Sequence, residues 1–394
     1  MVGAQSCCAQ LMQLRNERAQ QDCAPTQMNA VDEKWMRRAL ALARRGEGLT
    51  KPNPPVGAVL VKRGKKIGEG FHRIAGGPHA EVVALLNAGK AARGATLYVT
   101  LEPCSTWGRT PPCTDALLAA GIARVVVGAT DPNPKHAGRG LALLRRRGVV
   151  VVAGVCRAEA EELIAPFAKH QLKGRPYVTL KLGQTLDGRI ADATGSSRWI
   201  TSPAARARVQ ALRRRADVIM VGGETVRADN PSLLPRPSED RCPLRVVVTA
   251  SGKIPPRSQV LRDAFAACTL IATTPTGARH VKKIKTKASI WAPPTRDGQV
   301  DVAALLQKLG ERGCLHVLCE GGGQLAAELL RAGLVDELQL FIAPKMLGGD
   351  ARPAIGGGWL LAAAPQFEVR EVGRVGPDVW LRLCKVERDL RARW

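Results

Sequence analysis

The stretch from residue 95 to residue 154 decides the fold, because it holds three short apolar runs: ATLYVTL (95–101), ARVVVGA (123–129) and VVVVAG (149–154). Helix-forming stretches separate these runs, at 114–120 and near 140–147. Alternation of such runs with helices is typical of parallel strands in a layered α/β domain. Upstream, the sequence predicts helices at 31–42 and from about residue 80, and strands at 56–61 and 67–71.

The same alternation restarts after the polar stretch KHQLKGRP (169–176), which we take as a domain boundary. Ser202 and Pro203 are the residue types expected at the start of a helix. Seven strands are predicted, at 177–183, 217–222, 244–250, 269–274, 315–320, 336–344 and 379–384, with helices at 203–215, 301–312 and 324–332. We therefore expect a disordered extension over 1–30, one α/β domain over 31–172 and a second over 173–394.

Composition and charge restrict the classes of protein to which the chain can belong. The 394 residues carry a net charge of +25, distributed as +11 over 31–172 and +14 over 173–394, with none over 1–30. This spread, without a basic tail, indicates a generically basic, solvated surface, which allows attraction of anionic substrates and does not require nucleic-acid binding. No apolar run approaches the length of a membrane span. Eleven cysteines, an odd number, and the lack of a secretory signal in the first 30 residues predict a cytoplasmic protein.

The first domain holds residue types that bind zinc, at an ordered spacing. His79 precedes Ala-Glu, Cys104 follows Glu-Pro and Cys113 follows Pro-Pro. A catalytic zinc needs three protein ligands and an open position for water, and an imidazole with two thiolates is a suitable set. We assign His79, Cys104 and Cys113 as ligands and Glu81 as the general acid/base. H-x-E followed by P-C is the signature of zinc nucleobase deaminases, although eight residues separate these cysteines instead of two.

Further segments extend this signature over the whole of 31–172, namely PNPPVGAVLV, GEGFH, PHAE, VTLEPCS, GRTPPC and DPNP in that order. They resemble the deaminase domain of bifunctional riboflavin-biosynthesis enzymes, where the longer cysteine spacing is normal. The resemblance implies a cytidine-deaminase-like three-layer fold, bound Zn²⁺, and a substrate pocket lined by Asn53, His72 and Arg109, with Arg109 on the phosphate. Where that family usually has a histidine, this chain has Thr106, and we expect the exchange to affect substrate affinity or the rate of deamination.

The second half contains two glycine-rich turns, at Gly222-Gly223 and at Gly321–Gly323. Each follows a predicted strand, and the second precedes a predicted helix. Such a turn lets a phosphate approach the free N–H groups at a helix N-terminus, although turn chemistry alone also explains it. Neither turn has the spacing G-x-G-x-x-G, so a Rossmann dinucleotide site is not indicated.

The segments KLGQTLDGRIA, SRWITS, TVRADNPSLL, EGGGQL and DELQLFIAPKMLGG, spread over 175–394, resemble the reductase domain of the same bifunctional enzymes, which is similar in fold to dihydrofolate reductase. The resemblance implies NADPH contacts at Gly183, Trp199, Thr225, Asp229, Gly322, Gly323, Gln324, Leu325, Ala326, Ala327 and Glu328. It implies substrate contacts at Lys181, Ser197, Arg213, Leu233, Arg236 and Glu320. Pro235 departs from the family, and we expect it to alter the loop that presents Arg236.

The sequence thus predicts a bifunctional enzyme of riboflavin biosynthesis. Its first half would deaminate 2,5-diamino-6-(5-phosphoribosylamino)pyrimidin-4-one with zinc. Its second half would reduce the ribosyl group of 5-amino-6-(5-phosphoribosylamino)uracil to ribityl with NADPH. The expected partners are this phosphorylated pyrimidine and, by resemblance, further copies of the chain, with neither nucleic acid nor membrane. Two alternatives stay open: a nucleic-acid or nucleotide deaminase with an appended domain, and a family member with a single activity.

Overall fold

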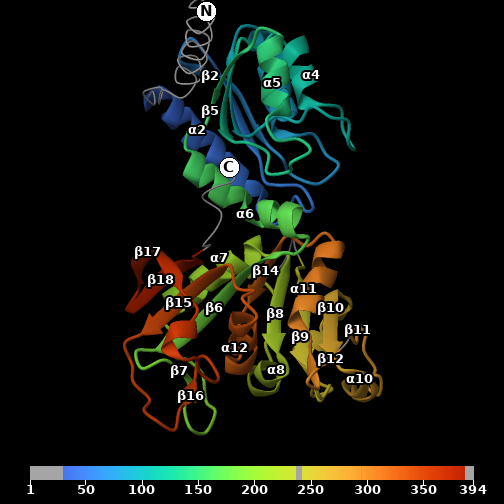
Figure 1. The fold of residues 1–394 in the computed structure, drawn as a ribbon, viewed down its shortest axis with the longest axis vertical. Coiled ribbons are helices and arrows are strands. Elements are labelled where there is room, and N and C mark those ends of the chain that lie inside the picture. Colours follow the sequence, from blue (N-terminus) through green and yellow to red (C-terminus); the bar gives the residue numbers. More distant parts are fainter. Residues whose placement is uncertain (1–29, 237–241, 294, 387–394) are drawn as a thin grey trace, which may run out of the picture.

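The computed structural model describes residues 30–236, 242–293 and 295–386. They form two domains stacked end to end, each with its own sheet (Figure 1). The extension expected over 1–30 lies outside this part of the chain, except for residue 30. None of the described helices is long and apolar enough to cross a membrane.

The N-terminal sheet has the strand order β2-β1-β3-β4-β5. β1 pairs antiparallel with β2 and β3, whereas β3, β4 and β5 run parallel. The three apolar runs of residues 95–154 form β3, β4 and β5, as predicted. The bounds are β1 (Gly57–Lys62), β2 (Lys65–Phe71), β3 (Thr96–Leu101), β4 (Arg124–Ala129) and β5 (Val150–Ala153).

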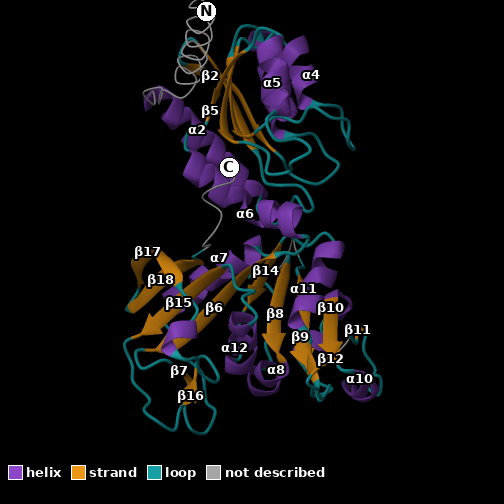
Figure 2. Ribbon diagram, viewed as in Figure 1, coloured by secondary structure: helices purple, strands orange, loops and turns teal. Residues whose placement is uncertain are grey.

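Helices cover both faces of this sheet and make three layers (Figure 2). One face carries α2 (Ala30–Ala43) and α6 (Arg157–Lys173), and the other carries α3 (Ala80–Ala88), α4 (Cys113–Ala119) and α5 (Arg139–Arg146). Successive side chains of a strand point to opposite faces. Accordingly Val126 packs with Met36 of α2, whereas Val125 and Val127 pack with Leu144 of α5. Two short 3-10 helices complete the domain, η1 (Arg44–Gly46) and η2 (Gly89–Ala92).

The C-terminal sheet has nine strands in the order β11-β10-β9-β8-β14-β6-β15-β18-β17. The strands from β11 to β15 are parallel, and β18 and β17 add an antiparallel edge. Their bounds are β6 (Tyr177–Thr185), β8 (Val218–Gly222), β9 (Leu244–Thr249), β10 (Thr269–Thr273), β11 (Ser289–Trp291), β14 (His316–Cys319), β15 (Glu337–Ala343), β17 (Phe367–Val375) and β18 (Asp378–Lys385). Two small ribbons lie apart, β7 (Arg189–Ala191) with β16 (Arg352–Pro353) and β12 (Thr295–Arg296) with β13 (Gln299–Val300).

Helices also cover both faces of the second sheet. Met220 of β8 belongs to the core under α11 and α12, and its neighbour Ile219 belongs to the core under α8, α9 and α10. Ser202 caps α7 as predicted, since its Oγ accepts a hydrogen bond from the Ala205 N–H at 3.3 Å. The bounds are α7 (Pro203–Arg215), α8 (Gly223–Asp229), α9 (Gln259–Arg262), α10 (Pro275–Val281), α11 (Val302–Glu311) and α12 (Gly323–Arg331), with η3 (Ala266–Cys268) and η4 (Leu361–Ala363).

Helix α6 joins the two domains and ends at Gly174, which has a φ of 68° that glycine adopts without strain. Its last turns contact the C-terminal domain. Lys169 Nζ lies 2.8 Å from Asp336 Oδ1, and His170 Nε2 donates a hydrogen bond to the Gly310 carbonyl at 2.9 Å. The same helix is therefore an outer layer of one domain and the surface that docks the other.

Candidate metal centre and sheet-edge site

The three predicted zinc ligands lie together at the carboxyl end of the N-terminal sheet. His79 is the N-cap residue of α3, Cys104 follows β3, and Cys113 opens α4. Their ligand atoms all lie within 4.8 Å of one another, and they form the one such His/Cys/Asp/Glu group found in the described chain. The distances and the soft donor set fit a zinc ion.

The orientation of His79 identifies its ligand atom. Nδ1 lies 3.2 Å from Cys113 Sγ and 3.6 Å from Cys104 Sγ, whereas Nε2 lies 3.3 Å from Thr110 Oγ1. Nδ1 therefore faces the metal position, and Nε2 can donate its proton to the threonine hydroxyl. A hydrogen bond from the ring nitrogen that does not bind the metal fixes the orientation of a ligating imidazole.

Glu81 lies in the first turn of α3 and is buried, with 3% of its surface exposed. Burial, followed by the nearby Cys104, raises the pKa of its carboxyl group to about 7. The structure thus places Glu81 beside the ligands without making it one of the three, as the predicted role of general acid/base requires.

Asn53 and His72 line the same cavity as His79, Glu81 and Cys104, and its volume is about 340 Å³. His72 Nδ1 lies 3.1 Å from the Pro78 carbonyl, which can only accept, so this nitrogen carries the proton. Nε2 then accepts from Asn53 Nδ2 at 3.1 Å. Burial lowers the pKa of His72. The pair is therefore neutral, and it presents the remaining polar atoms of Asn53 to the cavity.

Arg109, the predicted phosphate contact, is exposed and lines the cavity mouth together with Thr106. Thr106 Oγ1 faces His136 Nδ1 at 3.5 Å. His136 lies on the loop after β4, within the cavity lining. An imidazole therefore reaches this part of the cavity from a different segment, although residue 106 itself is not a histidine.

Sequence reasoning did not assign Glu102, whose carboxylate organises the loop that carries His136. Oε2 accepts hydrogen bonds from the backbone N–H groups of Asp131 (3.1 Å) and Gly138 (2.9 Å), and Oε1 accepts from Gly140 (2.8 Å) and Leu141 (3.4 Å). The loop needs glycine at residue 140, because an added Cβ would lie 2.2 Å from the Pro103 carbonyl oxygen.

Other cavity residues that the sequence reasoning missed are Asp131, Asn133, Phe167 and Gln171. Asp131 and Asn133 belong to the DPNP segment used for the resemblance, so the sequence contained a signal for them. Phe167 and Gln171 belong to α6, whose only sequence signal is its helical periodicity.

In the C-terminal domain, three predicted substrate residues lie near one another: Lys181 in the middle of β6, Glu320 just after β14 and Arg213 in the last turn of α7. Arg213 from α7 forms a buried two-bond ion pair with Glu320, with Nη2 to Oε2 at 2.9 Å, and also donates to the Leu234 carbonyl at 3.0 Å. Burial opposes the charge of Glu320, but Arg213 holds the pKa of its carboxyl below the ordinary value. Burial lowers the pKa of Lys181, and Glu320 partly offsets this effect.

A second group of predicted residues lies beside the first. Ser197 Oγ donates to Asp229 Oδ1 at 2.9 Å, and the charge of Asp229 also acts on Lys181. Trp199 is 61% exposed, and the guanidinium of Arg206 lies 4.3 Å from the centre of its ring. The structure therefore brings together residues predicted for the cofactor and for the substrate.

The predicted glycine turn links β14 to α12. Gly321 and Gly322 have φ values of 88° and 102°, which L side chains rarely adopt. A Cβ on Gly322 would lie 3.3 Å from Thr225 Oγ1, so this turn lies against the N-terminus of α8. A Cβ on Gly183 would lie 3.3 Å from Thr201 and 3.6 Å from Lys181 Nζ, which places Gly183 beside the substrate residues.

The predicted cofactor residues that lie within α12 direct most of their side chains into the core, away from the glycine turn. The side chains of Leu325, Ala326 and Ala327 are buried in the core, so contact with a cofactor would have to run through their backbone. Gly323 and Gln324 form the first turn of α12, and Glu328 is half-buried beyond it.

The segment with the unusual Pro235 is ordered up to Arg236. Leu233 is buried with a φ of 55°, an uncommon conformation for a bulky side chain. The Arg236 N–H donates to Gln210 at 3.0 Å, and its carbonyl accepts from Arg214 at 2.9 Å, so α7 holds the backbone while its side chain is exposed. Residues 237–241, which follow, lie outside the described chain.

Comparison with family models gives a match in each domain. Residues 29–129 match the cytidine and deoxycytidylate deaminase zinc-binding region, and residues 176–381 match the RibD C-terminal domain. Each match falls on one of the two sheets described above.

Similar whole proteins carry both domains. The riboflavin biosynthesis protein RibD of Escherichia coli is 47% identical, covering 89% of this chain and 99% of its own length, and RibD of Aquifex aeolicus is 44% identical over 81% and 88%.

Among solved structures, Acinetobacter baumannii RibD matches with a TM-score of 0.80 and 38% identity over 91% of this chain and 99% of its own. A Thermotoga maritima diaminohydroxyphosphoribosylaminopyrimidine deaminase/5-amino-6-(5-phosphoribosylamino)uracil reductase matches at 0.79 and 36%, over 90% and 99%. The predicted fold class, a deaminase-like domain followed by a reductase-like α/β domain, is thereby confirmed. The chain belongs to the RibD family of riboflavin biosynthesis proteins.

Proposed function

We propose that this protein catalyses two steps of riboflavin biosynthesis, one in each domain. The first is hydrolytic deamination of 2,5-diamino-6-(5-phosphoribosylamino)pyrimidin-4-one. The second is NADPH-dependent reduction of the ribosyl group of 5-amino-6-(5-phosphoribosylamino)uracil. The observation that carries the proposal is the His79, Cys104 and Cys113 cluster, which shares one cavity with the buried carboxyl group of Glu81.

In the deaminase, the residues of the chain position the substrate and move protons. Zinc held by His79, Cys104 and Cys113 would lower the pKa of a water molecule toward neutrality. Glu81 accepts a proton from this water and donates it to the amine that leaves as ammonia. Asn53, held by the neutral His72, is a hydrogen-bonding group for the pyrimidine edge. Arg109 at the cavity mouth attracts the phosphate.

In the reductase, the residues at the sheet edge bind the ribosyl chain and the cofactor. NADPH supplies the hydride, and the protein positions the two reactants. Lys181 is a buried amine that interacts electrostatically with the Glu320 and Asp229 carboxylates, and it would donate a hydrogen bond to a sugar oxygen. The glycine turn before α12 has backbone conformations typical of glycine and leads into a helix N-terminus, where a phosphate would accept hydrogen bonds from backbone N–H groups.

The experiment that tests the proposal separates the two activities in one preparation. For Glu81→Gln, we expect ammonia release to fall by about 10²- to 10⁴-fold, while the zinc content and NADPH oxidation on the deaminated substrate stay unchanged. Glu161→Gln, on the exposed face of α6, is the matched control and should retain both activities. Unchanged ammonia release in Glu81→Gln would refute the assigned role, and wild-type protein with only one of the two activities would refute the bifunctional proposal.

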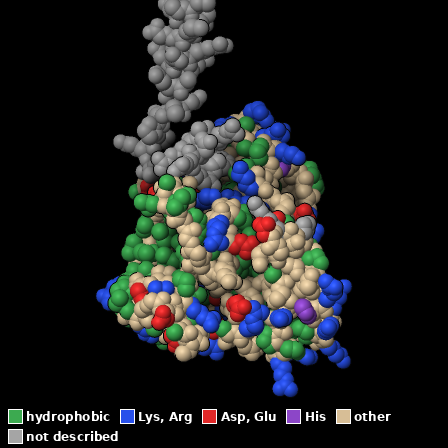
Figure 3. Space-filling model, turned by 60° about the horizontal axis from the view of Figure 1, so that its bottom comes forward, with side chains coloured by type: hydrophobic (Ala, Val, Ile, Leu, Met, Phe, Trp, Pro, Cys, Tyr) green, Lys and Arg blue, Asp and Glu red, His purple; other side chains and the backbone are tan. Residues whose placement is uncertain are grey.

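The distribution of charge on the protein surface is consistent with small anionic ligands. On the face drawn in Figure 3, Lys and Arg side chains are scattered and interspersed with acidic ones instead of forming one basic patch. This distribution supports electrostatic attraction of phosphorylated substrates more than binding of a nucleic-acid strand. Assembly into homo-oligomers and a cytoplasmic location remain predictions, testable by light scattering of the purified protein and by cell fractionation.

A further inference from the structure

His136 lies at the cavity of the metal centre, and the deamination described above gives it no role. It belongs to the loop between β4 and α5, and it lines the cavity together with Thr106 and Arg109. Its Nδ1 lies 3.5 Å from Thr106 Oγ1. Thr106 is two residues past the predicted ligand Cys104, so this contact joins two segments that lie 30 residues apart in the chain. The cavity mouth therefore holds an imidazole that comes from outside the zinc-ligand segments.

The backbone around His136 is fixed by its own hydrogen bonds. The His136 N–H donates to the Asn133 carbonyl at 2.8 Å, and the His136 carbonyl accepts from the Arg139 N–H, at the start of α5, at 2.9 Å. Two residues further along, the Gly138 N–H donates to the Glu102 carboxylate at 2.9 Å. The fold thus sets the position of the imidazole, and a ligand that binds it does not have to order the loop first.

Thr106 is placed to orient the ring of His136. A threonine hydroxyl can donate one hydrogen bond, and Nδ1 of a neutral imidazole can accept it. The ring proton then lies on Nε2, the other ring nitrogen. Among residues 30–236, 242–293 and 295–386, no hydrogen-bond partner is found for Nε2 of His136. This nitrogen is therefore available to donate a hydrogen bond to a ligand in the cavity.

The polar groups at the cavity mouth favour an anionic ligand. Arg109 is exposed, and it forms no ion pair with a carboxylate in the part of the chain that the structure describes. The nearby carboxylate of Asp131 accepts a hydrogen bond from the Asn133 N–H at 2.8 Å. Burial raises the pKa of this carboxyl group, while the Asn133 N–H and His136 partly offset the effect. The guanidinium of Arg109 and the imidazole of His136 are left to meet a negative group.

The shape of the site sets the direction in which the proposed substrate lies. Its amine-bearing ring has to reach the metal ligands and Glu81, and Cys113 and Glu81 are buried. Its phosphoribosyl end must then point away from them, toward the exposed residues Thr106 and Arg109 that line the same cavity. His136, which contacts Thr106, lies at this phosphate end.

We propose that His136 is a substrate-binding residue of the deaminase and donates a hydrogen bond from Nε2 to the phosphate of the substrate. The loop after β4 thereby supplies an imidazole to the part of the cavity where the family usually has a histidine at residue 106, and Thr106 orients it. This inference rests on the proposed deaminase function and deepens it, since it names a second residue, beside Arg109, that recognises the phosphate.

The test compares His136→Ala with Lys135→Ala, an exposed neighbour on the same loop that does not line the cavity. KM and kcat for ammonia release are measured with the phosphorylated substrate and with its riboside, which lacks the phosphate. Because a hydrogen bond to a charged group is lost, we expect His136→Ala to raise KM for the phosphorylated substrate roughly tenfold or more, with kcat within about threefold. The KM for the riboside and the zinc content should stay unchanged, and Lys135→Ala should match the wild type with both compounds.

A second variant shows whether an imidazole at this place is what matters. His136→Ala combined with Thr106→His returns an imidazole to the cavity mouth from the other segment, so KM for the phosphorylated substrate should recover toward the wild-type value. An unchanged KM in His136→Ala, an equal rise for the riboside, or no recovery in the combined variant would overturn the role of His136 only. A wild-type protein that releases ammonia from neither compound would overturn the proposed deaminase function itself.

Discussion

The two candidate sites differ in how their charged groups are satisfied. In the N-terminal domain, His79, Cys104 and Cys113 converge from three neighbouring segments beside one small cavity, and the partner proposed for them is a metal ion. In the C-terminal domain, Arg213 and Glu320 satisfy each other, and the other residues spread along a sheet edge. The first site is a compact reaction centre, whereas the second is an extended surface suited to a long ligand. Each prediction below tests one side of this comparison.

The largest effect is expected for removal of a metal ligand. Cys104→Ser should abolish zinc binding and reduce ammonia release to background, because a three-ligand site loses a thiolate. NADPH oxidation on the deaminated substrate should stay unchanged, since the reductase residues lie in a separate sheet. Metal analysis and the two assays check this expectation, with Cys156→Ala as the control for loss of another buried thiol. Loss of both activities would contradict the independence of the two sites.

The next largest effect concerns the ion pair of the C-terminal domain. Glu320→Leu should lower the free energy of unfolding by about 3–5 kcal/mol, because it leaves the buried Arg213 charge uncompensated. The double change Arg213→Met with Glu320→Leu should regain much of this stability, although neither protein should reduce the substrate. Chemical denaturation measures the difference. A double variant no more stable than the single one would contradict this account of the uncompensated Arg213 charge.

A smaller effect is expected for Glu102→Gln in the N-terminal domain. One glutamine NH₂ group would face backbone N–H groups that now donate to a carboxylate, so the loop from Asp131 to Leu141 should loosen. We expect a loss of about 1–3 kcal/mol in stability and a KM for deamination about tenfold higher, with zinc retained. Asp115→Asn, at an exposed position of α4, is the matched control. An unchanged KM would mean that this loop does not shape the cavity.

The smallest effect concerns the pH dependence of stability. The hydrogen bond from Arg124 is the main cause that lowers the pKa of Asp32. A carboxyl group with a lowered pKa in the folded state stabilises the fold above its unfolded pKa, and this contribution is lost as the pH falls through the folded value. Asp32→Asn should therefore be less stable by roughly 1 kcal/mol at pH 7, and the difference should shrink below about pH 4. Thermal unfolding across pH checks this, and a constant difference would contradict it.

Local sequence was sufficient to predict the elements and candidate site residues that depend on short segments of the chain. The three predicted zinc ligands could be brought together on paper because each lies beside a strand end or a helix start that its own neighbours specify, as with His79 before α3. The central strands were predictable because both of their faces are buried. The edge strand β17 was missed, since FEVREVGRV is mostly exposed and carries charges between its apolar residues.

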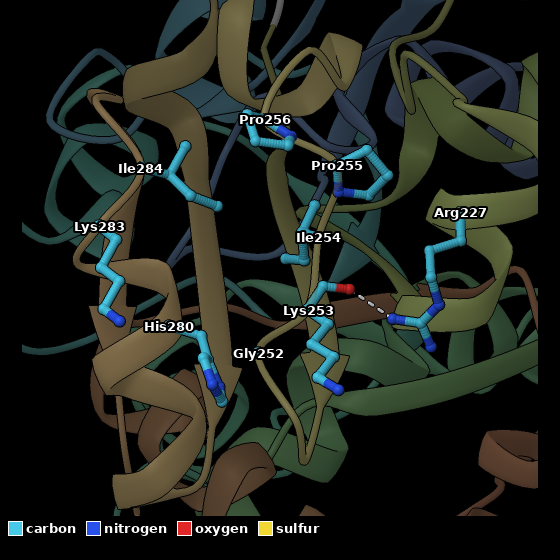
Figure 4. A pocket seen from close by; sticks show the side chains of 9 residues that line it. All are labelled: Arg227, Gly252, Lys253, Ile254, Pro255, Pro256, His280, Lys283 and Ile284. Atoms are coloured by element: carbon cyan, nitrogen blue, oxygen red, sulfur yellow. Dashed lines mark hydrogen bonds between the residues drawn. The ribbon is translucent and has the colours of Figure 1, made fainter.

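Other features could not be read from the sequence because they depend on distant contacts. The four N–H donors to Glu102 come from residues 29 to 39 positions further along the chain. The pocket between the segments that follow β8, β9 and β10 (Figure 4) is lined by residues from 227 to 284, whose proximity depends on the order of these strands in the sheet. Arg213 resembles the other arginines at the end of α7, and only the fold shows that it is buried against Glu320.

Helix α6 forms one wall of the cavity at the metal centre and also contacts the C-terminal domain. Phe167 and Gln171 line the cavity of the metal centre, while Lys169 and His170, between them in sequence, contact the C-terminal domain. A polypeptide divided between the domains would leave this wall without its outer support, and Asp336 would lose Lys169. Joining the two domains in one chain therefore keeps α6 supported at the metal-centre cavity. This benefit does not require the intermediate to pass directly from one site to the other.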